Sequence, residues 1–272
     1  MFNEFACQLH IIANLSPILL SSFASHETVV TRSAKEDPVD ASSPSVFILL
    51  RELARYFSER SSGMHPEYNH WMSYARNAGV KSAALPAFLG NRFNILLVIA
   101  ARVFSLKDHF IAFIEEFYSE KEEMKYLADG LRNPLILGQV QVLGLLDQLL
   151  TGPMWRLAEH SIHVLDTCHY VEQFLGWIEE RISSPDKLFS ADVPTIALRT
   201  DDPFRKGPLV DCLLAVAPSD EALDAASHAL VATRTYFRNI FSAYLPGGSY
   251  YLLHPMMRLI ELYCNCLWLL HL

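Results

Sequence analysis

The sequence lacks the short motifs that mark the common catalytic sites. It contains no Gly-x-Ser-x-Gly nucleophile turn, no Gly-x-x-x-x-Gly-Lys phosphate loop and no His-Glu-x-x-His metalloprotease pattern. Cys168 and His169 are adjacent, but neighbouring residues of a helix point in different directions, so they do not pair a cysteine nucleophile with its base. From these absences we expect a protein that is not an enzyme and that carries no cofactor.

Basic residues and regularly spaced cysteines are also scarce. The chain has 22 lysines and arginines against 30 aspartates and glutamates, a net charge of -8 at pH 7. Because a broad grip on nucleic acid depends on cations that displace counterions, we expect any DNA contact to be local and weak. The five cysteines show no framework spacing, which favours a reducing, intracellular location, either nuclear or cytoplasmic.

Two apolar stretches lack features that targeting and membrane segments need. Residues 11–20 are apolar, but Glu4 is the only charged side chain before His10, whereas a signal peptide begins with basic residues. Residues 250–272 are also apolar, yet Arg258 and Glu261 interrupt a run that needs about 18 uncharged residues to span a membrane. We therefore expect no membrane association.

A helical spacing of apolar residues is what the sequence does contain. With 51% hydrophobic residues, the chain has enough material for a core, and we expect a mostly α, multi-helix globular fold. Between Leu96 and Phe117 the apolar residues recur in steps of three and four, the spacing of one helix face. Asn94 is placed to cap this helix with its side-chain oxygen. On this long helix, Phe110 and Phe117 are the candidate interface residues.

Further helices are expected at residues 46–58, 135–150, 166–182 and 219–244. Ser45, Asp166 and Ser219 are the expected caps of three of them. In the apolar helix at 135–150 we expect breaks at its two glycines, Gly138 and Gly144, and an end at Thr151-Gly152-Pro153. Residues 183–211 contain four prolines and no sustained period, which predicts a long irregular loop.

Cys7 and His10 form a Cys-x-x-His pair, which could supply half of a tetrahedral zinc site. The remaining clusters, His160-x-x-His163 and Cys168-His169, lie more than a hundred residues away. The alternative is a structural cysteine and histidine on one helix face. We expect no metal, with Cys7 and His10 as the zinc candidates.

Four short blocks resemble those of a known family, in the family's order. CQLHIIANL resembles the Cys-x-x-His-x-Leu-Asn-Leu block of hAT-superfamily (hobo–Activator–Tam3) DNA transposases, and GNRFN resembles their Arg-Trp-Asn block. LGLLDQLLTGPMWR and LPGG resemble blocks of related transposon-derived animal genes. The resemblance covers roughly residues 5–250. Its motif positions in this chain are Cys7, His10, Arg92, Phe93, Asn94 and Trp155.

The resemblance implies a chain that is truncated at both ends and catalytically inactive. Transposases of this class cut DNA with three carboxylates that hold two metal ions. The first two family aspartates precede the block that begins here at Cys7, and Glu261 lies in a context that does not match the family glutamate. The implied organisation is a remnant of a ribonuclease-H-like domain at 1–110, a helical insertion at 111–250 with the loop at 183–211, and a diverged apolar tail at 251–272.

Two other functions remain open. A helical interaction or scaffold protein would self-associate, as a homo-oligomer, through Phe110 and Phe117. A metal-dependent nuclease would bind divalent ions tightly. Trp155 also has two interpretations, because an exposed tryptophan could stack on a base, whereas one at helical spacing beside Leu157 packs into a core. The function that the resemblance favours is an inactive transposase-derived protein with at most helix-mediated contact to protein or DNA.

Overall fold

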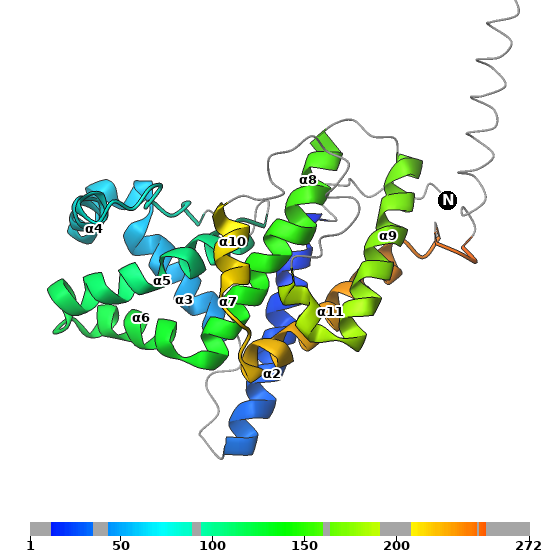
Figure 1. Ribbon diagram of the computed structural model, residues 1–272, viewed down its shortest axis with the longest axis horizontal. Helices are drawn as coiled ribbons and strands as arrows, with labels where there is room; N and C mark the ends of the chain where they lie inside the picture. Colours follow the sequence, from blue (N-terminus) through cyan, green and yellow to red (C-terminus); the bar gives the residue numbers. More distant parts are fainter. Residues whose placement is uncertain are drawn as a thin grey trace, which may run out of the picture.

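The computed structural model describes residues 12–34, 43–88, 94–159, 164–190, 208–243 and 245–248. Within these ranges the chain is helical, with one isolated β-bridge between Ser58 and Leu85 and no β-strand (Figure 1). The expectation of a mostly α, multi-helix fold is therefore confirmed. The finer expectation of a ribonuclease-H-like remnant is not confirmed.

The described helices run in chain order from α2 to α11. Between them lie the 3₁₀ turns η1 (Glu59–Gly63) and η4 (Pro185–Phe189) and the π-helical turn η3 (Asp147–Thr151). The α-helices are α2 (Leu15–Ala34), α3 (Ser45–Phe57), α4 (Pro66–Asn77), α5 (Ile95–Tyr118), α6 (Glu122–Arg132), α7 (Pro134–Leu146), α8 (Gly152–Glu159), α9 (Val164–Ser183), α10 (Pro208–Ala215) and α11 (Asp220–Ile240).

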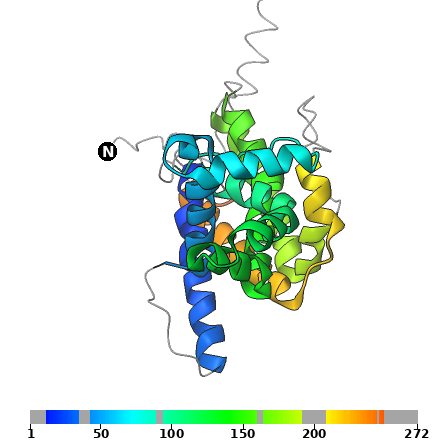
Figure 2. The same cartoon turned by 90° about the vertical axis from the view of Figure 1, so that its left-hand side faces the viewer.

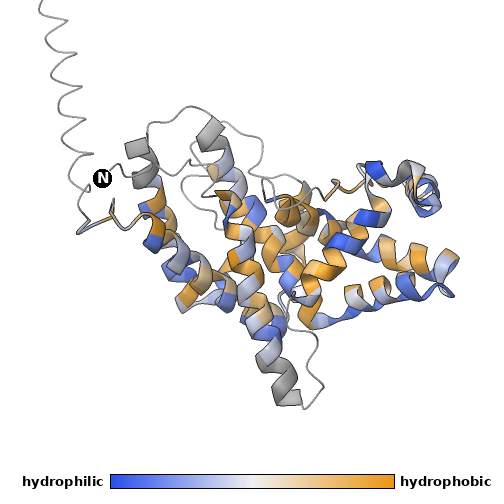
Figure 3. Cartoon of the chain, turned by 180° about the vertical axis from the view of Figure 1, so that it is seen from behind, coloured by the Kyte–Doolittle hydropathy of each residue, from blue (hydrophilic) through white to orange (hydrophobic). Residues whose placement is uncertain are grey.

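Helix α7 forms the centre of the packing, between α5 and α11. Its residues from Gly138 to Leu146 are all buried, as expected of a helix that is apolar on every side. Helices α5 and α6 form an antiparallel pair, and α6 is orange on the side that faces α5 and blue on its outer side (Figure 3). Apolar residues from α2 to α11 join in one hydrophobic cluster.

The expected breaks in the apolar helix were wrong. A Cβ at Gly138 would lie 2.9 Å from the Cα of Ala222, and one at Gly144 would lie 3.0 Å from the Cα of Ala101. These glycines therefore permit close approach of α11 and α5 instead of ending the helix. The helix also continues through Thr151-Gly152-Pro153, because the π-helical turn directly before Pro153 widens the backbone where a proline ring would collide with a preceding carbonyl.

This continuous segment, Pro134–Trp155, is long and apolar enough to cross a membrane, but 78% of its most apolar window is buried inside the protein. Its contacts with α5 and α11 are those of a core helix.

Helix α5 matches its predicted span, but Asn94, the residue before it, acts differently from the prediction. Asn94 has a left-handed backbone (φ 53°) and makes no side-chain capping bond. Instead its side-chain Nδ2 donates to the backbone oxygen of Ile12 at 2.7 Å, a contact between residues 82 positions apart. The predicted cap is therefore a long-range bond that ties the start of α5 to the residues preceding α2.

The other predicted caps have different outcomes. Ser219 accepts a bond from the N–H of Ala222 at 3.2 Å, which confirms the cap of α11. Ser45 is the first residue of α3, and its N–H and hydroxyl donate to the carboxylate of Glu27 on α2. Helix α9 begins at Val164, so Asp166 lies within its first turn.

The expected boundary between residues 110 and 111 falls inside α5, a continuous helix. Residues on both sides of it belong to the same hydrophobic cluster, so the described parts of the two expected regions pack as one unit. The expected loop at 183–211 contains η4 and the start of α10. The tail at 251–272 and the family positions Cys7, His10, Arg92 and Phe93 lie outside the described residues.

Candidate functional site on the seam between two distant helices

Helices α2 and α11 pack side by side in antiparallel directions. The hydroxyl of Ser22 donates to the backbone oxygen of His228 at 3.2 Å, and one turn further along α2 His26 bonds Asp224, one turn earlier on α11. Residue numbers therefore increase along α2 in the direction in which they decrease along α11. In both views the C-terminal end of α2 extends beyond the other helices (Figures 1 and 2).

His26 lies where the apolar face of α2 continues. Ile12, Leu15, Leu19 and Phe23 are buried at helical spacing, and His26 takes the next position of that stripe with a side chain only 2% exposed. A buried imidazole needs a polar partner. Its Nε2 lies 2.7 Å from Oδ2 of Asp224.

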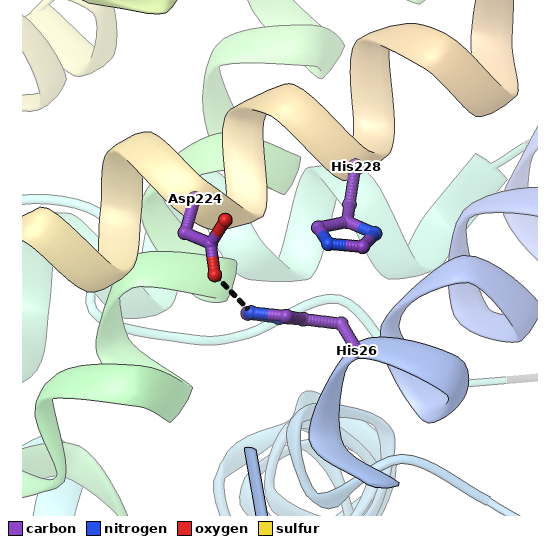
Figure 4. A group of neighbouring side chains, drawn as sticks. All are labelled: His26, Asp224 and His228. Atoms are coloured by element: carbon purple, nitrogen blue, oxygen red, sulfur yellow. Dashed lines mark hydrogen bonds and ion pairs between the residues drawn. The ribbon is translucent and has the colours of Figure 1, made fainter. Parts of the chain in front are cut away.

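His228 completes a cluster of three potential ligands. Its ring stacks on that of His26 with centroids 4.6 Å apart and planes inclined by 28°. Asp224 and His228 lie one helical turn apart on α11 and face His26 across the seam (Figure 4). One ligand atom from each of the three residues lies within 4.8 Å of the others. This arrangement brings two imidazoles and one carboxylate together.

Two features of the cluster concern access and hydrogen bonding. The Asp224 side chain is 57% exposed, so the cluster is open to solvent on that side. Nδ1 of His26 is buried and has no hydrogen-bond partner among the described residues. His26 therefore forms one hydrogen bond, from Nε2 to Asp224, while its second ring nitrogen stays without a partner among the described residues.

The second candidate feature is the far end of α5. Phe110 is completely buried and stacks on Trp71, so its prediction as an interface residue was wrong: a partner cannot contact it without opening the core. Phe117 is 40% exposed and packs its inner edge on His70, with ring centroids 4.3 Å apart. Its role at an interface stays a prediction.

Five exposed carboxylates lie close to Phe117 along the chain. We define the acidic α5–α6 end as Phe117 together with the exposed Glu115, Glu116, Glu120, Glu122 and Glu123. Arg132 pairs with Glu115, and Lys121 reaches away to the largely buried Glu67 at 2.6 Å. The side chains of this end combine one apolar ring with an excess of negative charge.

Trp155, the last family position in a described part of the chain, is partly buried and packs against the hydrophobic cluster. The packing of Trp155 therefore fits a core residue better than a base-stacking residue. Asp147, the acidic residue of the same block, is buried and accepts bonds from Gln148 at 2.6 Å and Thr151 at 3.4 Å.

The fold and these two features define a helical protein with a polar helix–helix seam and an acidic, partly apolar end. In comparisons with known proteins, no family model matches the chain, and no curated protein or solved structure matches it.

Proposed function

We propose that this protein derives from a hAT-like transposase, does not cut DNA, and acts inside the cell by contact with another protein. The support for the origin is the four blocks in family order, CQLHIIANL, GNRFN, LGLLDQLLTGPMWR and LPGG. In this proposal residues 1–110 descend from the ribonuclease-H-like region and 111–250 from the helical insertion. Asp147, the acid within the third block, already serves as a hydrogen-bond acceptor inside the π-helical turn.

The observation that carries the proposed contact is the exposure of Phe117 within the acidic α5–α6 end. An exposed aromatic ring supplies the apolar anchor that interfaces use, and the surrounding carboxylates select its partner by charge. DNA and a second copy of the same surface are both repelled by negative charge. The partner that fits best is therefore a protein segment with basic residues around an apolar side chain.

Peptide titration tests this proposal. The probes are a fluorescent amphipathic peptide of lysine and leucine, its glutamate counterpart, and a short DNA duplex, each titrated with the full chain and followed by anisotropy. The basic peptide should bind, and Phe117→Ser should weaken binding about tenfold, the loss of one apolar anchor. Raising the salt concentration should weaken binding further.

Val231→Ser is the matched control, because Val231 on α11 is also 40% exposed. It should leave the affinity for the basic peptide unchanged. If Phe117→Ser binds the basic peptide as well as the parent chain, the acidic α5–α6 end is not the contact surface. Tighter binding of DNA than of the basic peptide contradicts the proposal.

The self-associating scaffold is the second candidate, and exposed Phe117 is the observation that keeps it open. Sedimentation velocity at two protein concentrations separates the two functions. A monomer at both concentrations favours the hetero-contact, whereas a mass that rises with concentration and falls in Phe117→Ser favours the scaffold.

The nuclease alternative needs its own experiment. Supercoiled plasmid is incubated with the full chain and Mg²⁺ or Mn²⁺, and calorimetry follows ion binding. We expect no nicking and no heat from tight ion binding. Metal-dependent nicking that persists after repurification would replace the proposal with a nuclease.

A further inference from the structure

We propose that His26, Asp224 and His228 bind one divalent transition-metal ion of the zinc type, which joins α2 to α11. The proposal is independent of the proposed contact function. It rests on the convergence of three ligand atoms within 4.8 Å of one another from two helices that are far apart in the sequence. Asp224 and His228, one turn apart on the same face of α11, form the pair, and His26 is the ligand across the seam (Figure 4).

The donor set selects the kind of ion. Two imidazole nitrogens and one carboxylate oxygen suit Zn²⁺, Co²⁺, Ni²⁺ and Cu²⁺, whereas Mg²⁺ and Ca²⁺ prefer oxygen ligands throughout. Zinc sites with three protein ligands hold water in the fourth position. The exposed side of Asp224, whose side chain is 57% accessible, provides the space for that water.

A tetrahedral site requires the ring of His228 to turn out of its stack on His26, because the lone pairs of two nearly parallel rings do not converge on one ion. Two atoms that bind zinc at about 2.0 Å lie about 3.3 Å apart in a tetrahedron. The His26 and Asp224 atoms, now 2.7 Å apart, need to separate slightly. The His228 ligand atom needs to approach them. Asp224 and His228 can make these moves by side-chain rotation, because the Asp224 side chain is 57% exposed and His228 is not buried.

Ion binding also involves His26. In the neutral ring that donates from Nε2 to Asp224, the proton leaves Nε2, the metal takes its lone pair, and Nδ1 receives a proton. Nδ1 is buried without a partner among the described residues, so its N–H needs an acceptor, either a bound water or an oxygen brought within reach by a small shift of the ring. A zinc site whose histidines all have hydrogen-bond acceptors would bind more tightly. We therefore expect a moderate metal affinity that falls measurably when one of the three ligands is removed.

The test uses the full chain with the metal alone. Thermal unfolding is measured with Zn²⁺ and with chelator, and visible absorption follows Co²⁺, whose tetrahedral complexes absorb strongly. One equivalent of Co²⁺ should give the tetrahedral spectrum, and Zn²⁺ should raise the melting temperature. Asp224→Asn and His228→Gln should each weaken binding about tenfold or more, while circular dichroism confirms that both variants fold.

Two control variants make the result specific. His109→Gln removes a histidine on α5, away from the seam, and Cys7→Ser with His10→Gln removes the zinc candidates of the sequence. Both should bind as the parent chain does. The proposal is overturned by the lack of any metal effect, by unchanged binding in Asp224→Asn and His228→Gln, or by binding that only the Cys7/His10 variant loses.

Discussion

The indole ring of Trp71 lies on the ring of Phe110, with centroids 4.4 Å apart and planes inclined by 24°. The same indole donates its Nε1–H to the backbone oxygen of Ala83 at 3.0 Å. One side chain thus joins α4, the segment before α5, and α5 itself. The indole N–H is satisfied although the residue is completely buried, which is the usual condition for a tryptophan inside a core.

The two phenylalanines predicted as interface residues should differ in their effect on stability. Phe110→Ala removes a fully buried ring and should lower the free energy of unfolding by about 3–5 kcal/mol. Phe117→Ala removes a ring that is 40% exposed and should cost about 1 kcal/mol or less. Urea unfolding followed by circular dichroism measures both. Equal losses in the two variants would contradict the placement of Phe110 in the core.

Gly138 should not tolerate a methyl group. A Cβ there meets the backbone of Ala222 at 2.9 Å, so Gly138→Ala should push α7 and α11 apart and cost about 1–3 kcal/mol. Gly176, exposed on α9, is the matched control, because a Cβ at this residue would meet nothing within 4 Å. Gly176→Ala should stabilise the chain by up to about 1 kcal/mol, because alanine is the better helix former. Thermal melts of the two variants should therefore shift in opposite directions.

The Glu67–Lys121 ion pair should give a pH-dependent contribution to stability. Burial raises the pKa of the Glu67 carboxyl, but the hydrogen bond from Lys121, at 2.6 Å, and the charge of Lys121 outweigh burial and lower it. The hydrogen bond that Lys121 donates to Glu67 raises the pKa of Lys121, against the opposing effect of burial. The stabilisation is then complete between the unfolded values of 4.5 and 10.5, and it declines below and above this window.

Glu67→Gln tests this pair. At pH 7 it should cost about 1 kcal/mol, because the partner Lys121 keeps access to water. The difference between the parent chain and the variant should shrink as the pH falls below the unfolded glutamate value, measured as urea midpoints across the pH range. A difference that stays constant down to acid pH would mean that shape, and not charge, makes residue 67 important.

At Asn94, the cost of losing a hydrogen bond can be separated from the cost of a left-handed backbone. Asn94→Ala loses the bond to Ile12 and places alanine at φ 53°, with an expected cost of about 2–3 kcal/mol. Asn94→Gly loses the same bond but removes the strain of the left-handed backbone, so it should cost about 1 kcal/mol less. Denaturant midpoints rank the three chains. If glycine is no better than alanine, backbone strain contributes nothing at this position.

The fold class and several helix spans could be predicted from periodicity alone. The stripe from Leu96 to Phe113 is buried in α5 as its spacing indicated, and Ser219 caps α11. The prediction from the sequence failed at glycine, a residue that can either end a helix or allow a second helix to pack closely. Gly138 and Gly144 have the residue type of helix breakers, yet they are points of close approach, which depend on a neighbouring helix that spacing along one helix cannot reveal.

The cluster of His26, Asp224 and His228 was not predicted, because its members come from two helices that are far apart in the sequence. Asp224 and His228 show the one-turn spacing of a helical ligand pair, and His26 extends the apolar stripe that ends at Phe23. Neither the spacing of Asp224 and His228 nor the position of His26 points to a metal site without the other. Their meeting depends on the antiparallel register of α2 and α11, which the spacing within either helix leaves open.

The pairing of α2 with α11 has a consequence for synthesis. His26 and Asp224 are 198 positions apart, so α2 emerges from the ribosome long before the helix that covers it. The face of α2 that packs on α11 therefore stays uncovered on the nascent chain until residues beyond 220 are made. Contacts of such long sequence separation form slowly, and exposed apolar surface at that stage attracts chaperones or other nascent chains. A chain stopped before α11 would leave α2, near the opposite end of the sequence, without its main packing partner.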